Sequence, residues 1–189
     1  MQVFRSGFAR AIALVLTLVL LLSVGYTAIT VDTLQGISLI PITLLIISIT
    51  WVLFWFPRVQ VDEGGVRIIN LVSTHYISWA AIQRIDTRFA LTIFTEGKKY
   101  SAWGAPAPGR HASFFATRDQ GRHLPETTYL AGTVRPGDLI NSDSGAAAAV
   151  IRSKWETKRE SGQAAVSTSW HFAKIAVLLL LMVTAVVVG

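Results

Sequence analysis

The sequence predicts an α-helical membrane anchor of three transmembrane helices joined to a small α+β domain built on an antiparallel sheet. Two observations predict this architecture. Charge-free apolar runs occupy both ends of the 189-residue chain, and short strand-like segments followed by one helical segment lie between them. The hydrophobic content of 52% exceeds that of a typical soluble domain because of the terminal runs.

Two apolar runs near the N-terminus are each long enough to cross a bilayer as a helix. Residues 11–30 and 37–56 each contain twenty residues without a charge, and a helix of that length spans about 30 Å. Trp51 and Trp55 lie at the end of the second run and Arg58 follows it, where interfacial side chains are enriched. Residues 1–56 are therefore predicted to form a two-helix membrane hairpin, and the alternative is a cleaved signal peptide in the first run.

A third apolar run closes the chain. Residues 175–189 are uncharged, and the predicted helix extends back over 170–189 with Trp170 and Lys174 at the membrane interface. We expect a short third span that leaves the C-terminus outside the cell. The alternative is a tail that only dips into the bilayer.

The distribution of basic residues predicts the orientation of the chain. Fourteen of its 17 Lys and Arg residues lie between Arg58 and Arg159, whereas the loop 31–36 contains none. Basic residues accumulate on the cytoplasmic side of membrane proteins. The N-terminus and the middle domain are therefore predicted to be cytoplasmic in a multi-pass protein of the cell membrane. The net charge of +6 is explained by this rule, and no nucleic-acid partner is expected.

The middle region, residues 57–162, is predicted to be one domain. Tight turns at 62–65 and 96–98 separate short alternating segments, which is typical of an antiparallel meander or small barrel. An irregular stretch over 104–142 follows, with one further strand expected at 127–134. The predicted strands are 59–61, 66–72, 75–79, 85–89, 91–95 and 99–103, with a helical turn at 79–82.

A helix is predicted from Ala146 to about Ser161, capped by Asp143 or Ser144. Gly162 is expected to end it. Arg152 and Glu156 have the spacing of an i,i+4 ion pair. Its apolar face contains Ala147, Val150, Ile151 and Trp155.

The segments 57–66, 77–82 and 91–103 together resemble bacterial pleckstrin-homology-like (PH-like) domains. The resemblance is to the membrane-anchored actinobacterial type found in low-molecular-weight antigen proteins, and it covers residues 11–160. It implies a bent antiparallel sheet closed at one end by the C-terminal helix.

The sequence lacks the common catalytic and metal-binding motifs. The chain has no cysteine, no GxSxG or SxxK motif, and no histidine pair with the spacing of a metal site. We therefore expect a non-catalytic protein with no cofactor, no metal and no small-molecule substrate.

Two groups of residues are predicted to contact lipid or a partner. Arg84, Arg88, Lys98 and Lys99 can form a basic patch, although charged residues on strands are also typical of a solvated face. Phe114 and Phe115 can contact the inner leaflet or a partner, or pack back on the domain. The first hairpin, residues 62–65, is acidic, whereas phosphoinositide-binding PH domains carry basic residues there.

These features predict an accessory or scaffold subunit of a larger membrane complex, which contacts other membrane subunits and lipids. The resemblance makes the actinobacterial respiratory cytochrome bcc–oxidase supercomplex a concrete candidate. The alternative is a free-standing membrane-tethered adaptor that binds a protein or peptide through an open sheet edge, or anionic headgroups at the inner leaflet.

Overall fold

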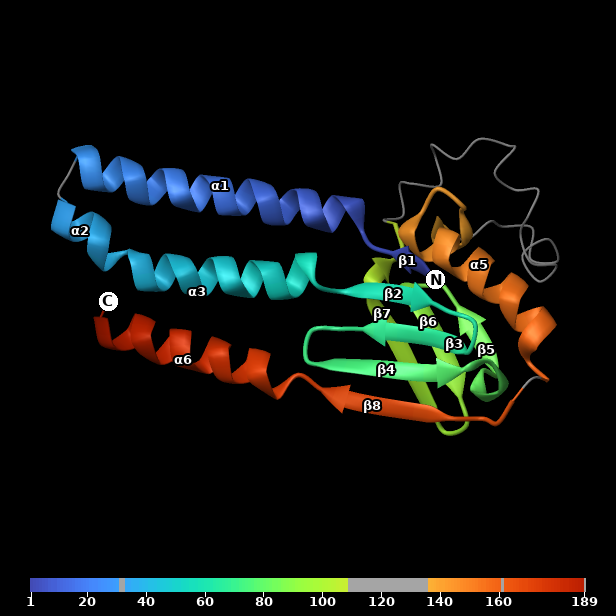
Figure 1. Ribbon diagram of the computed structural model, residues 1–189. Coiled ribbons are helices and arrows are strands. Elements are labelled where there is room, and N and C mark those ends of the chain that lie inside the picture. The colour runs from blue at the N-terminus through green and yellow to red at the C-terminus, as the bar shows by residue number, and fades with distance from the viewer. Residues whose placement is uncertain (31–32, 109–135, 161, 189) are drawn as a thin grey trace. The chain divides into compact units, whose positions relative to one another are not determined.

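The computed structural model of the chain describes residues 1–30, 33–108, 136–160 and 162–188. The chain divides into two compact units, a sheet-containing domain and a helical unit (Figure 1). The domain consists of Met1–Ser6 and Pro57–Ser169, and the helical unit consists of Gly7–Phe56 and Trp170–Gly189. The predicted strand at 127–134 lies outside the described residues.

Among the described residues, the helical unit contains one helix that is long and apolar enough to cross a membrane, whereas the sequence predicts three. This helix is α1 (Gly7–Thr30), of 24 residues. The second predicted span is interrupted, because α2 (Thr33–Ser38) ends before Pro41 and α3 (Ile40–Thr50) begins again beside it. Proline has no N–H to continue a helix, which explains the break. The π-helix η1 (Trp51–Trp55) extends α3, and α6 (Phe172–Val188) is the third apolar helix; both are shorter than a full span.

Polar and aromatic contacts join α1 to η1. The indole Nε1 of Trp51 donates a hydrogen bond to Thr17 Oγ1 at 3.0 Å. The Arg10 guanidinium lies 4.1 Å from the centre of the Trp55 ring. Trp51 and Trp55, which the sequence assigns to the membrane interface, therefore also fasten the helices of this unit to one another.

The larger sheet of the domain has five strands in the order β1-β2-β3-β4-β8 (Figure 1). Its neighbouring strands are antiparallel, including β4 and β8, because Ser78 N donates to Ala165 O while His75 contacts Thr168. The two outer strands were not predicted. β1 is only three residues long, and β8 is exposed along its whole length, so neither shows an apolar alternation. The strands are β1 (Gln2–Phe4), β2 (Arg58–Val61), β3 (Gly65–Ile69), β4 (Ser73–Ser78) and β8 (Val166–Trp170).

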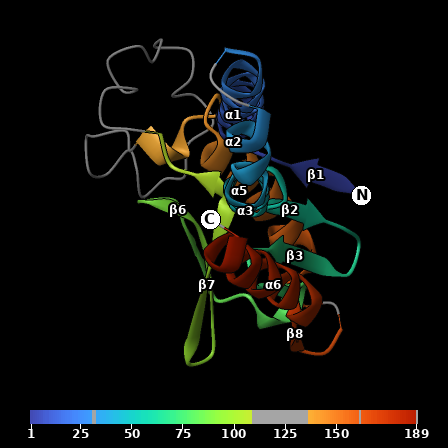
Figure 2. The ribbon, with the colours of Figure 1, turned by 90° about the vertical axis from the view of Figure 1, so that its left-hand side faces the viewer.

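A second antiparallel sheet contains β5 (Arg84–Asp86), β6 (Ala90–Thr95) and β7 (Lys98–Pro106). Figure 2 shows the β6–β7 hairpin on one side of the domain and β2 and β3 on the other. The predicted strand 85–89 ends early, because the Asp86 carboxylate accepts the N–H groups of Thr87 and Arg88 and turns the chain. β7 continues to Pro106, so the irregular stretch begins later than the expected residue 104.

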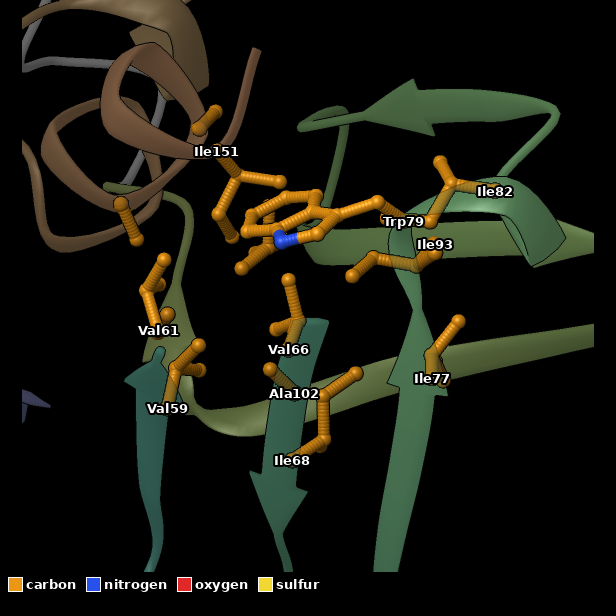
Figure 3. Close-up of a cluster of buried hydrophobic side chains, with 14 of the residues drawn as sticks. Val59, Val61, Val66, Ile68, Ile77, Trp79, Ile82, Ile93, Ala102 and Ile151 are labelled. Atoms are coloured by element: carbon orange, nitrogen blue, oxygen red, sulfur yellow. The ribbon is translucent and has the colours of Figure 1, made fainter. Parts of the chain in front are cut away.

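The hydrophobic core lies between the two sheets and is closed by α5 (Asp143–Lys158), in agreement with a bent sheet and a C-terminal helix. Figure 3 shows Trp79 at its centre, between the strand side chains and Ile151 of α5. Trp79 follows β4 in the short 3-10 helix η2 (Trp79–Ala81) and is 2% exposed. Its Nε1 donates to Glu63 O at 3.0 Å, so the one polar atom of this indole is satisfied.

The N-terminal cap and the ion pair of α5 both differ from those predicted. Its cap is Ser142, whose Oγ accepts from Gly145 N at 2.9 Å, and not Asp143 or Ser144. Arg152 pairs with Asp138 at 3.0 Å instead of with Glu156, because the short 3-10 helix η5 (Pro136–Asp138) brings a buried carboxylate next to it. The predicted apolar face is confirmed, with Ala147 and Ile151 buried and Val150 and Trp155 packed against the core.

Candidate interaction surface

The first hairpin of the domain is closed to anions by its own contacts. Asp62 Oδ1 accepts hydrogen bonds from the N–H groups of Gly64 and Gly65, both at 2.9 Å. Glu63 forms ion pairs with Lys154 and Lys158 of α5. The hydrogen bonds from Lys158 and Lys154 lower the pKa of Glu63 from 4.5 to about 2. The two α5 lysines are thus held by a carboxylate of the same domain.

A hollow of about 580 Å³ lies on the outer face of the smaller sheet, between β6–β7 and the turn that joins β3 to β4. We call it the β7 hollow. Outward residues of β6 and β7, the β5–β6 loop and the β3–β4 turn line it. The lining residues include Asn70, Val72, Arg88, Phe89, Lys99 and Trp103.

Three large apolar side chains at the β7 hollow are exposed. The exposed fraction is 80% for Phe89, 54% for Trp103 and 43% for Val72. They come from the β5–β6 loop, strand β7 and the β3–β4 turn, and they border the same hollow. An exposed apolar cluster beside polar residues is typical of an interaction site.

The structure divides the predicted basic patch. Arg88 and Lys99 line the β7 hollow, together with the carboxylate of Asp86. Arg84 stacks on Phe94, another lining residue, with 4.0 Å between its guanidinium carbon and the ring centre. Lys98 is not among the lining residues, because neighbouring residues of a strand face opposite sides. Phe114 and Phe115 lie outside the described residues.

Asn70 fixes the wall of the hollow. Its Nδ2 donates to Ser101 O at 2.9 Å, and its Oδ1 accepts from Trp103 N at 2.9 Å. These two bonds hold the β3–β4 turn against β7 and determine where Trp103 lies. Asn70, Val72, Phe89 and Trp103 are not among the site residues predicted from the sequence. For Val72, Phe89 and Trp103, the available signal was an apolar side chain at an outward strand, loop or turn position.

The β7 hollow lies at the end of the domain where the chain enters and leaves the sheet. Ile69, just before the turn, is paired with Arg58, the first residue of β2. Gly104 of β7 packs so closely on Pro57 and Arg58 that an added Cβ would lie 2.6 Å from Arg58 N. Phe4 at the end of β1 is paired with Val59 at the same end of the sheet.

The described part of the chain contains no cluster of three metal-ligating side chains. Of the membrane-interface residues predicted from the sequence, Arg58 begins β2 and Trp170 ends β8. Burial, together with the nearby Arg5, lowers the pKa of Arg58. Lys174 lies in α6, with its Nζ 4.8 Å from the Phe56 ring centre.

The two sheets, the closing helix α5 and the exposed hollow together describe the architecture of the domain. Residues 56–138 match the family model of the bacterial PH domain. The chain therefore contains a PH-like domain, a type of module that is typically non-catalytic and binds lipids or proteins. The match ends before α5, so the structure supplies the closing helix. No curated protein and no solved structure gives a significant match to the chain.

Proposed function

We propose that this protein is a non-catalytic accessory subunit of a larger membrane complex, anchored by its apolar helices and using the PH-like domain for interaction. The pairing of β1 with β2 carries the proposal. The residues just before α1 and just after η1 are antiparallel neighbours, with Phe4 opposite Val59 and Gln2 opposite Val61. Both ends of the segment that contains α1, α2 and α3 therefore meet at one end of one sheet.

This pairing supports a helical hairpin in the membrane. If α1 crosses the bilayer, the chain has to return to the same side before Arg58 in order to form β2. Among the described residues between α1 and β2, the longest continuous helical stretch for the return is α3 with η1, whose 11 and 5 residues span about 24 Å. Local thinning of the bilayer accommodates a mismatch of this size at modest cost.

The same pairing argues against a cleaved signal peptide. Cleavage after α1 would remove Gln2–Phe4, and the domain would lose the strand that covers the outer edge of β2. The alternative function, an adaptor that binds a peptide on an open sheet edge, would use the edge strands β1 or β8 of the larger sheet, or β5 or β7 of the smaller one.

We further propose that α6 crosses the membrane as a third span and that the basic domain is cytoplasmic. β8 leads into α6 after one residue, His171, so the third crossing begins where the sheet ends. The C-terminus is then outside the cell.

A groove between α3–η1 and α6 supports contact with a partner helix. Its volume is about 460 Å³, and apolar side chains line it together with Ser48, Trp51 and Lys174. A small polar residue beside large apolar ones is typical of helix packing in membranes. The actinobacterial respiratory cytochrome bcc–oxidase supercomplex remains the concrete candidate for the complex.

Purification of the tagged full-length protein in a mild detergent, followed by mass spectrometry, tests the proposal. Stoichiometric co-purification with a multi-subunit membrane complex is the expected result, and a lone chain would contradict it. Ser48→Phe fills the groove and should reduce co-purification. Ile49→Phe is the matched control, because residue 49 is 39% exposed and does not line the groove.

A further inference from the structure

The β7 hollow combines exposed apolar side chains with basic ones. Phe89, Trp103 and Val72 expose apolar area, and Arg88 and Lys99 place two cations beside it. Asp86 adds one carboxylate, but its Oδ1 accepts two backbone N–H groups of the adjoining loop. Two cations against one carboxylate leave the lining with a formal net positive charge, which favours an incoming anion.

The covalent connections of the domain limit how far this hollow can be from a membrane. Two residues separate β1 from α1, one separates η1 and its cap Phe56 from β2, and one separates β8 from α6. An extended residue spans at most about 3.6 Å, so the longest of these connections can reach no further than roughly 11 Å. The headgroup layer on each side of a bilayer is itself about 5–8 Å thick.

The β3–β4 turn and Trp103 lie at this same end of the sheet. Ile69 pairs with Arg58, and Asn70 binds both Ser101 and Trp103. An aromatic ring with a polar edge, such as Trp, is favoured in the headgroup layer, and Lys and Arg are attracted to anionic lipids. The first hairpin does not compete for this role, because Glu63 occupies the α5 lysines.

We propose that the β7 hollow docks on the surface of an anionic phospholipid bilayer. Phe89, Trp103 and Val72 enter the interfacial layer, and Arg88 and Lys99 contact lipid phosphates. Asn70 acts as a positioning residue, since it holds the turn and Trp103 together. This inference rests on the membrane anchoring in the proposed function, but not on the identity of any partner complex.

Because the chain has no cysteine, single-cysteine variants can be spin-labelled without background. The full-length Phe89→Cys and Trp103→Cys proteins carry a nitroxide in vesicles of phosphatidylcholine with phosphatidylglycerol. Collision with oxygen, which concentrates in the bilayer, is compared with collision with a water-soluble nickel chelate. Ile140→Cys is the matched control, because Ile140 is 39% exposed and does not line the hollow.

The oxygen-to-nickel ratio should be several-fold higher at positions 89 and 103 than at position 140. It should fall in vesicles of phosphatidylcholine alone. Ratios at 89 and 103 equal to the ratio at 140 would overturn the proposal. Protection from both reagents would also overturn it, because protein and not lipid would then cover the hollow.

Charge reversal tests the choice of an anionic surface. Arg88→Glu combined with Lys99→Glu should lower the ratio at the Phe89→Cys label, whereas Lys98→Glu should leave it unchanged. Equal ratios in the double variant and the unchanged protein would overturn the anionic assignment. Vesicle flotation of the same samples separates the two proposals, because a chain that does not float contradicts the anchor itself.

Discussion

His75 contacts side chains on two neighbouring strands through its two ring nitrogens. Its Nδ1 lies 2.9 Å from Thr168 Oγ1 of β8, and its Nε2 lies 2.9 Å from Ser73 Oγ. Burial lowers the pKa of His75 below its ordinary value of 6.5. The folded domain therefore favours the neutral imidazole, which joins the outer strand β8 to β4.

A group with a lowered folded-state pKa binds more protons when the chain is unfolded. Stability is therefore fully present above about pH 6.5, and it is lost as the pH falls through the folded-state pKa. We predict that the midpoint of urea unfolding is lower at pH 5.5 than at pH 8. Trp fluorescence of the full-length protein in detergent measures the unfolding. In His75→Gln this difference should shrink. An unchanged difference would show that another group is responsible.

At the scale of elements, the closing helix α5 is held by a buried carboxylate. Asp138 Oδ1 accepts from Thr87 Oγ1 at 2.6 Å and from Arg152 Nη2 at 3.0 Å. The side chain of Asp138 is 5% exposed, so both donors depend on it. Gly137 and Gly145 permit this approach, because a Cβ on either would lie within about 2 Å of a carbonyl oxygen.

Asp138→Ala should destabilise the domain by about 1–3 kcal/mol, the usual cost of leaving buried hydrogen-bonding partners unsatisfied. Thermal unfolding of the full-length protein measures the effect. The matched control is Asp143→Ala, at the first residue of α5, where loss of a favourable helix-terminus charge costs less than about 1 kcal/mol. Equal effects of the two changes would contradict a special role for Asp138.

The elements that the sequence predicts correctly are those with a strong local pattern. The side chains of β2 alternate between half-buried and buried along its four residues, and those of β6 show the same alternation over six residues. The strand ends were less predictable, because side chains such as Asp86 and Asn70 redirect the backbone through hydrogen bonds. Arg88 and Phe89, which were expected in a strand, therefore lie in the loop between β5 and β6.

At the scale of the whole molecule, the pairing of β1 with β2 leads to a specific topology. The N-terminus and the PH-like domain should lie on one side of the membrane, and the connection between α1 and α3 on the other. Single cysteines at Gln2 and Glu96 should react alike with a membrane-impermeant maleimide in inverted vesicles.

A cysteine at Leu34 should react in right-side-out vesicles instead. Residue 34 is 73% exposed within the helical unit, so poor access in the protein does not limit the reaction. Reaction of Gln2→Cys and Leu34→Cys from the same side would contradict the hairpin. Detergent-solubilised samples supply the value for complete labelling.

The sequence by itself determined the apolar terminal runs, the inner strands, the buried face of α5 and the resemblance to PH-like domains. Each of these depends on local periodicity or local motifs. The tertiary structure alone decided that β1 and β8 flank the sheet and that Asn70, Phe89 and Trp103 border one hollow. Such contacts join residues tens of positions apart. Their stability comes from pairing and packing that no short window of sequence encodes.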